Sequence, residues 1–389
     1  MSTTTARSTL IPADVRLANL VRIIQELRSS GALSRSDVAR HVGMSLPTVH
    51  RLVSDLAELE LVQEENTAAD GLRLGRPPTV YRFREDAAVL AGVDVGNETT
   101  RLALTTLSGR VLVSLSFPSE QLGRDLCATL AAKIREMLGS AGLPADRLAG
   151  VGVGAAAVVD ADGVLRAPPT HQAWDGLPVR EYLSGQLGCE VTVAQDDHLS
   201  PIAESSDAGT FPGASSLLVL EIGRGIGIGM TLDGTPVSGA HGRFGRIAGW
   251  PVSTPAGTSG RTLGECLVTR GLVDQYRARG GTGYVHDGAA LAAAARAGDG
   301  EARAVLGWAA SEIADIVRRL QQLCDPQAIV IGGGLARAHD LLQPALSLQL
   351  PPDIRIARSV LGEQAVVAGA ILVAGSFVED WLSRRLARA

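Results

Sequence analysis

The segment Ser34–Leu56 constrains the fold most, because it predicts two short helices joined by a tight turn. Ser34 suits the first N-cap, Asp37 follows three residues later as in a capping box, and Gly43 stands where the chain must turn. Ser45 suits a second N-cap, and Pro47 fits the first turn of the helix behind it. Apolar side chains then recur at helical spacing and predict one buried face: Val49, Leu52, Val53 and Leu56.

The opposite face of the second helix carries short polar and basic side chains. Such side chains contact base edges and phosphates when a helix lies in the major groove of DNA. A pair of amphipathic helices in any small helical domain has a similar pattern, so that alternative stays open. The predicted DNA-contacting residues of the two helices are Ser34, Arg35, Ser45, Pro47, Thr48, His50 and Arg51.

The flanks of this segment extend it to a winged helix-turn-helix domain over residues 12–84. Apolar residues at helical spacing between Leu17 and Leu27 predict a preceding helix that ends at Gly31. Apolar runs on either side of Asp70-Gly71 predict a two-stranded wing that carries Arg73. Its Gly75-Arg76-Pro77 run is slim and extended, and either inserts Arg76 into a minor groove or serves as a stiff linker.

Composition agrees with a DNA-reading domain on an acidic body. The chain of 389 residues has a net charge of −5, which argues against a protein that coats nucleic acid. Residues 1–84, however, hold 11 arginines against 9 Asp or Glu, a net charge of +2. Four dispersed cysteines indicate buried thiols in a reducing compartment. With no recognisable signal peptide and no apolar run of spanning length, we expect a cytoplasmic protein without membrane contact.

The body, from residue 88 to 380, alternates strands and helices and predicts an α/β fold of two lobes that divide near residue 196. Glycine runs follow three of the expected strands, at residues 94–99, 223–229 and 332–334. Backbone amides in such runs can cradle phosphate, although glycine also simply makes tight turns.

Three stretches then resemble the ROK family of repressors and sugar kinases, and the resemblance covers roughly residues 12–380. Leu220–Gly242 is similar to the family's strand, glycine loop and G-A-H-G signature. Asp325-Pro326 with Ile329–Gly334 resembles its adenosine-side segment, and Leu361–Ala370 its C-terminal segment. The resemblance implies an actin-like ATPase fold for the body. With a DNA-binding domain in front, it implies a transcription regulator, usually a repressor relieved by a sugar, in dimeric or tetrameric form.

Departures from the family pattern argue against nucleotide binding. The phosphate-loop positions are Asp94, Gly96, Gly223, Arg224, Gly225 and Gly333. Glu98 stands in the first loop, where its negative charge opposes a triphosphate. Arg224 replaces a threonine between two glycines, and its bulk can fill the nucleotide space. We therefore expect no bound cofactor and no enzymatic activity.

The sugar pocket departs from the family pattern as well. Asp196 matches the family's general base, which predicts a vestigial catalytic residue. Arg246 stands where a sugar-binding glutamate is expected. Cys266 alone remains of three zinc-binding cysteines, and one thiol cannot hold zinc, so we expect no metal. The residues predicted to bind an effector are Thr170, Gln195, Asp196, His241 and Arg246.

Three hypotheses about this pocket stay open. It binds an anionic sugar derivative, if Arg246 converges with Arg243, Arg261 or His171; it is vestigial, with Arg246 paired to an internal aspartate; or it binds an ordinary sugar in altered geometry. For the whole chain we predict a DNA-binding transcription regulator, a repressor of carbohydrate-related genes. An ATP-dependent sugar kinase with an added N-terminal domain and a purely structural adaptor remain the alternatives.

Overall fold

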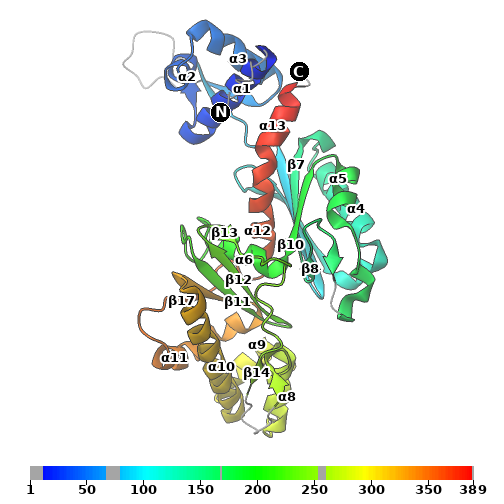
Figure 1. Cartoon of the computed structure of the whole chain (residues 1–389), viewed down its shortest axis with the longest axis vertical. Coiled ribbons are helices and arrows are strands. Elements are labelled where there is room, and N and C mark those ends of the chain that lie inside the picture. Colours follow the sequence, from blue (N-terminus) through cyan, green and yellow to red (C-terminus); the bar gives the residue numbers. More distant parts are fainter. Residues whose placement is uncertain (1–11, 67–78, 167–168, 253–259, 388–389) are drawn as a thin grey trace, which may run out of the picture.

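The structure is a computed structural model that describes residues 12–66, 79–166, 169–252 and 260–387. Three parts follow one another along the long axis of the molecule (Figure 1). An N-terminal headpiece lies at one end, lobe 1 lies in the middle, and lobe 2 lies at the other end. The two lobes each contain a five-stranded mixed sheet, as expected for an α/β body.

The headpiece contains the predicted helix-turn-helix. Its helices are α1 (Pro12–Ser30), α2 (Arg35–Val42) and α3 (Leu46–Glu58). Ser34 Oγ accepts a hydrogen bond from the amide of Asp37 and so caps α2, while Gly43 ends that helix in the left-handed conformation at φ 67°. Ser45 Oγ accepts from the amide of Thr48 at the start of α3. The predicted apolar stripe of α3 is buried.

A three-stranded sheet completes the headpiece, in the order β1 (Leu33–Ser34), β3 (Thr79–Phe83), β2 (Val62–Asn66). Strands β2 and β3 pair antiparallel, from Val62 opposite Phe83 to Asn66 opposite Thr79. The segment that contains Gly75-Arg76-Pro77 comes between these two strands in the sequence, and the minor-groove and linker hypotheses for it both stay open. The wing residues Arg73 and Arg76 themselves lie outside the described residues.

Lobe 1 has the strand order β10-β7-β4-β5-β6, with parallel pairing in its first three strands and antiparallel pairing beyond. Helices α4 (Leu126–Ser140) and α5 (Val179–Leu187) cover one face of this sheet (Figure 1). The strands are β4 (Val89–Val95), β5 (Thr99–Thr106), β6 (Val111–Pro118), β7 (Leu148–Ala155) and β10 (Glu190–Gln195). The single strand predicted over Leu148–Val159 is broken after Ala155, and β8 (Val158–Val159) pairs instead with β9 (Leu165–Arg166).

Lobe 2 has the strand order β13-β12-β11-β16-β17. Its strands are β11 (Leu217–Ile222), β12 (Ile226–Leu232), β13 (Thr235–Pro236), β16 (Ala328–Gly332) and β17 (Ile356–Arg358), with β14 (Pro251–Val252) and β15 (Arg261–Thr262) as a separate pair. Its helices are α7 (Leu263–Cys266), α8 (Thr269–Ala278), α9 (Gly288–Arg296), α10 (Gly300–Cys324) and α11 (His339–Gln349). The alanine-rich stretch predicted to be helical thus forms α9 and α10.

Helices α6 (Asp196–Glu204) and α12 (Ala365–Ala374) pack together at the junction of the lobes. Helix α12 lies directly on strands β4 and β7, because the strands carry glycines beneath it. A Cβ at Gly152 would lie only 1.9 Å from the carbonyl oxygen of Ala370. Likewise, a Cβ at Gly369 would lie 2.2 Å from the carbonyl oxygen of Leu199 on α6. These close backbone contacts fix α12 against lobe 1 and against α6.

The C-terminal helix α13 (Val378–Ala387) continues α12 through a short 3₁₀ turn, Gly375–Phe377, and reaches the headpiece (Figure 1). Apolar residues of α1 and α13 share one core: Leu20, Ile23, Ile24, Leu27, Val378, Trp381, Leu382 and Leu386. Gln25 also donates a hydrogen bond of 3.0 Å to Glu379. Arg147 of lobe 1 pairs with Glu60 of the headpiece and donates to the carbonyl of Ala87. The headpiece is therefore packed onto the body.

The expectation that no apolar run has the length to span a membrane needs correction. Gly362–Ala387 is long and apolar enough to cross a membrane, with a mean hydropathy of 1.6 in its most apolar window. In the structure it packs against β4, β7, α6 and α1, which are the contacts of a core helix.

Of the four predicted buried thiols, Cys324 is only partly buried. Burial raises the pKa of Cys127 to about 11 and that of Cys189 to about 12.

Candidate functional site

The exposed face of α3 presents the predicted polar and basic residues. Pro47, His50 and Arg51 are exposed, and Thr48 is partly exposed. Ser45 stands at the exposed N-cap, where its hydroxyl lies 2.7 Å from that of Thr48. The N-terminal half of α3 therefore combines exposed hydrogen-bonding groups with the guanidinium of Arg51, as a helix that enters a major groove requires.

Two of the predicted DNA-contacting residues lie behind this surface. Ser34 is 8% exposed, because its hydroxyl caps α2. The guanidinium of Arg35 stacks 4.6 Å from the ring centroid of Tyr81 and lies 3.2 Å from His50 Nε2. Since arginine only donates, His50 Nε2 accepts in this bond. Ser34 and Arg35 thus position α2, the wing and α3 relative to one another.

The glycine runs of the body meet at the cleft between the lobes. Gly223 follows β11, and a Cβ on it would lie 3.3 Å from the amide of Gly334, which follows the parallel strand β16. Gly333 has φ 72°, and a Cβ there would lie 2.5 Å from the carbonyl oxygen of Ile222. Gly227 and Gly229 do not belong to a phosphate loop, in contrast to the prediction. They lie inside β12, where Asp197 packs against them.

Ion pairs cross the cleft where phosphate loops were predicted. Glu98 of lobe 1 pairs with Arg224 of lobe 2, so the two departures noted in the sequence compensate each other's charge. A second chain of ion pairs runs beside it. Arg101 Nη1 lies 3.5 Å from Asp94 Oδ2, and Arg101 Nη2 lies 2.5 Å from Glu363 Oε2. Glu363 Oε1 in turn lies 2.8 Å from Nη2 of Arg337 in lobe 2. Neither Glu363 nor Arg337 was predicted as a site residue, because the two meet only through the fold.

Four carboxyl groups interact near these loops, those of Asp94, Asp196, Asp197 and Glu221. Burial raises the pKa of Asp94 to about 7 and that of Glu221 to about 8. The pKa values of Asp196 and Asp197 are also raised, first by burial, and for Asp196 next by the negative charge of Asp197. A buried carboxyl with raised pKa holds its proton near neutral pH. The predicted vestigial base, Asp196, therefore sits in an environment that favours its uncharged form.

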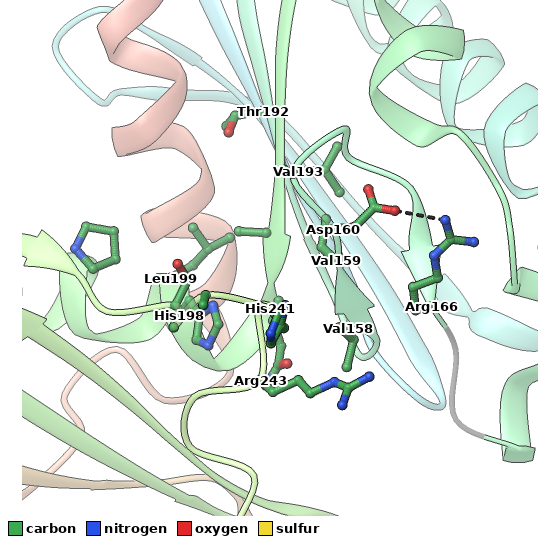
Figure 2. A pocket seen from close by; sticks show the side chains of 18 of the residues that line it. Val158, Val159, Asp160, Arg166, Thr192, Val193, His198, Leu199, His241 and Arg243 are labelled. Atoms are coloured by element: carbon green, nitrogen blue, oxygen red, sulfur yellow. Dashed lines mark hydrogen bonds and ion pairs between the residues drawn. The ribbon is translucent and has the colours of Figure 1, made fainter.

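A cavity of about 1140 Å³ opens between the lobes beside α6. Its walls come from the β8–β9 hairpin and β10 of lobe 1, from α6, and from the loop after β13 in lobe 2. Figure 2 shows Asp160 and Arg166 on one wall and His198, His241 and Arg243 on the facing side. Arg166 pairs with Asp160 at 3.0 Å. The loop after β13 also touches lobe 1, since a Cβ at Gly242 would lie 2.5 Å from the carbonyl oxygen of Val159.

Three of the five predicted effector residues line this cavity: Gln195, His241 and Arg246. Arg243 joins them, and Arg166 and Asp160 are lining residues that sequence reasoning missed, because the hairpin that carries them has no distinctive motif. Asp196 and Arg261 are not among the lining residues; Arg261 donates instead to the carbonyl of Glu265. The side chains of Thr170 and His171 lie outside the described part of the structure.

Within the described ranges, no group of three or more His, Cys, Asp or Glu side chains has an arrangement that could hold a metal ion. Cys266, the single cysteine of the segment that resembles a zinc site, is fully buried in the apolar core of lobe 2. Burial raises the pKa of its thiol, which disfavours the thiolate that zinc binds.

Comparison with known proteins gives matches to both parts of the chain. The family profile described as ROK family matches residues 90–375. The profile described as IclR helix-turn-helix domain matches residues 16–66. The first covers lobes 1 and 2 with α12, and the second covers α1 to β2 of the headpiece.

Among individual proteins, a glucokinase of Halalkalibacterium halodurans is 27% identical over 65% of this chain and 82% of its own length. The xylose repressor of Caldicellulosiruptor bescii is 20% identical over 94% of this chain and 96% of its own. A crystal structure of a regulator described as a homologue of the E. coli MLC protein aligns with a TM-score of 0.75 at 22% identity. That alignment covers 96% of this chain and all of the other, and it supports the fold of headpiece and body together.

Proposed function

This chain belongs to the ROK family and carries a helix-turn-helix DNA-binding domain, as its transcriptional regulators do, and we propose that it is a repressor of carbohydrate-related genes that a small effector releases from DNA. The observation that carries the proposal is the exposed N-terminal turn of α3, with Thr48, His50 and Arg51 on a headpiece that is packed onto the body. A metabolic kinase has no use for this surface, whereas an operator-binding protein depends on it.

The packing offers a route from the cavity to the headpiece. Helix α6 contributes His198 and Leu199 to the cavity wall, and α12 contributes Val373. Helix α12 is in close backbone contact with α6 at Gly369 and leads into α13, whose apolar face packs against α1. A ligand with a higher affinity for one relative position of the lobes than for the other would therefore shift the headpiece as well.

The names of two relatives support a link to carbohydrates. One relative is named a glucokinase and the other a xylose repressor. The xylose repressor aligns over nearly the whole length of both chains, whereas the glucokinase alignment spans 65% of this chain. The paired Glu98 and Arg224 in the nucleotide cleft favour the regulator over the kinase, because they occupy the place of phosphate loops.

The proposal includes a homodimer or tetramer in the cytoplasm. Two headpieces on one palindromic site would place their α3 helices in successive major grooves, one helical turn of DNA apart. Light scattering of the purified protein tests the oligomeric state, and footprinting tests the palindrome.

The direct test is selection of duplex DNA from a random pool by the full-length protein, followed by affinity measurements on the selected sequence. We expect one enriched palindromic motif, bound at least a thousandfold more tightly than random DNA. Arg51→Ala should lose most of that preference. Arg270→Ala, on the outer surface of α8 with 92% of its side chain exposed, is the control of equal charge and should bind like wild type. If no motif is enriched, the proposal is wrong and the adaptor hypothesis gains.

A further inference from the structure

The cavity between the lobes is rich in positive charge. Arg166, Arg243 and Arg246 line it, and Asp160 is the only acidic residue among the lining residues that the structure describes. Asp160 is already paired with Arg166. Arg243 and Arg246 are exposed to the cavity and form no ion pair with any residue in the described ranges. The hypothesis that Arg246 forms an internal salt bridge with Asp196 or Asp197 is therefore not supported.

One carboxyl group outside the lining, that of Asp197, acts electrostatically on Arg246. Burial raises the pKa of Asp197 above its ordinary value, and the positive charge of Arg246 offsets only part of that effect. Asp197 also accepts a hydrogen bond of 3.1 Å from Gln195 Nε2, so one of its oxygens is engaged. Two guanidinium groups thus face a concave space whose walls hold little negative charge, which is where an anion gains most from the focused field.

Gln195 supplies a hydrogen-bond acceptor at the wall of the same cavity. Gln195 is 4% exposed and lines the cavity, and its Oε1 has no hydrogen-bond partner among the described residues. An unpaired buried carbonyl oxygen costs free energy unless a ligand or water donates to it. A sugar hydroxyl can donate to it, whereas an ionised carboxylate, which only accepts, cannot.

The loop that carries both arginines is held in place. His198 Nε2 donates to the carbonyl of Phe244 at 3.3 Å, and the amide of Ile228 in β12 donates to the carbonyl of Gly245 at 3.0 Å. The pKa of His198 is lowered, mainly by burial, so this histidine is neutral when it makes the bond. The backbone that carries the two arginines is thereby held before a ligand arrives, which reduces the ordering cost of binding.

We propose that this cavity binds a polyhydroxylated anion, a sugar acid or a sugar phosphate, with Arg243 and Arg246 on its charged group and Gln195 on a hydroxyl. The inference rests on the proposed function, because this ligand is the effector that the repressor would sense. A neutral sugar lacks the group that two unpaired arginines bind in a bidentate way.

Isothermal titration calorimetry of the full-length protein without DNA tests the proposal. The probes are glucose, gluconate, glucuronate and glucose 6-phosphate, with acetate and inorganic phosphate as anions without a sugar. We expect at least one sugar anion to bind at least tenfold more tightly than glucose and than its matching bare anion. Gluconate or glucuronate against glucose 6-phosphate distinguishes a carboxylate from a phosphate as the preferred group.

Variants locate the site. Arg243→Gln and Arg246→Gln should each weaken binding of the sugar anion at least tenfold, while Arg270→Gln on α8 should leave it unchanged. Thermal melting of each variant verifies its fold, and since both arginines are exposed we expect unchanged melting. Glucose binding as tightly as every sugar anion, no binding by any of them, or binding that both variants retain would each overturn the inference.

DNA binding is measured separately on the same preparations, so that the two proposals fail independently. A protein that binds its selected motif but none of the sugar anions overturns only the inference about the ligand. A protein that selects no motif overturns the proposed function, while calorimetry still decides what the cavity binds.

Discussion

Glu98 of lobe 1 and Arg224 of lobe 2 form an ion pair across the cleft between the lobes. Each residue alone is a departure that disfavours a nucleotide, one by charge and the other by bulk. Together they are complementary, and they connect the loop after β4 to the loop after β11. Arg101, Glu363 and Arg337 extend the same connection. The cleft of this protein is therefore bridged by its own side chains.

A charge-swap cycle tests the Glu98–Arg224 pair. Arg224→Glu should lower the free energy of unfolding, since it puts two carboxylates together, and Glu98→Arg should do the same. The swapped double variant should recover most of the loss. Both side chains are more than half exposed, so we expect a coupling of about 0.2–1 kcal/mol that weakens in high salt, measured by urea denaturation. Strictly additive effects would show that the pair contributes nothing.

ATP should not be consumed by this protein. The Glu98–Arg224 ion pair occupies the place of the phosphate loops, and burial together with neighbouring carboxylates raises the pKa of Asp196, which makes it a poor anionic base at neutral pH. A coupled assay of ATP consumption across a panel of sugars should give the background rate. Sustained turnover that disappears in Asp196→Asn would instead identify a sugar kinase.

Arg51→Ala should weaken binding to the selected operator by about tenfold or more, because one good contact to a base edge or a set of phosphates contributes about 1–3 kcal/mol. Thr48→Ala should weaken it as well, by removing a hydroxyl from the same turn. Fluorescence anisotropy at fixed ionic strength measures both. Wild-type affinity in the two variants would place the DNA-binding surface elsewhere on the headpiece.

Glu221 gives stability a defined pH dependence. Burial raises the pKa of this carboxyl to about 8 in the folded protein, against 4.5 for an exposed glutamate. Between these two values the unfolded chain has released the proton and the folded protein has kept it. Folding therefore loses up to about 1.4 kcal/mol per pH unit from this group as pH rises from 4.5 to 8.

Glu221→Gln removes that loss, so its melting temperature should exceed that of wild type by an amount that grows from pH 5 to pH 8. Glu136→Gln on the exposed side of α4 is the control and should track wild type at every pH. A difference between Glu221→Gln and wild type that stays constant with pH would contradict the raised pKa.

Gly369→Ala should destabilise the protein by about 1–3 kcal/mol, because the added methyl group would lie 2.2 Å from the carbonyl oxygen of Leu199 and push α12 away from α6. Gly139→Ala in α4 is the matched control. Nothing lies within 4 Å of a Cβ there, and the change should stabilise by up to about 1 kcal/mol. Guanidinium denaturation of the two variants measures the contrast. Equal effects would mean that α12 moves freely.

Local signals in the sequence predicted the helix-turn-helix closely. N-caps such as Ser45, the turn at Gly43 and the apolar stripe of α3 act within a few residues of one another, so they can be read without knowing the fold. The strand Leu217–Ile222 was likewise predicted with its observed bounds, because a continuous apolar run followed by glycine is a short-range signal.

Glycine positions were harder to interpret. Gly227 and Gly229 follow a strand and so were predicted to form a phosphate loop, but they make room for Asp197 of α6. Gly152 similarly makes room for α12, which lies more than two hundred residues later in the chain. A sequence shows that a side chain is missing at such positions, and only the packed structure shows what approaches there.

By itself, then, the sequence determined the capped helices, the buried strands and the family of the body, since these depend on neighbours in the chain. Tertiary structure alone decided that Glu98 meets Arg224, that Arg243 and Arg246 line one cavity and form no ion pair with the described residues, and that α13 packs against α1. The physical reason is that charge and packing energies depend on distance in space. Residues far apart in the chain reach those distances only after the sheets and helices have assembled.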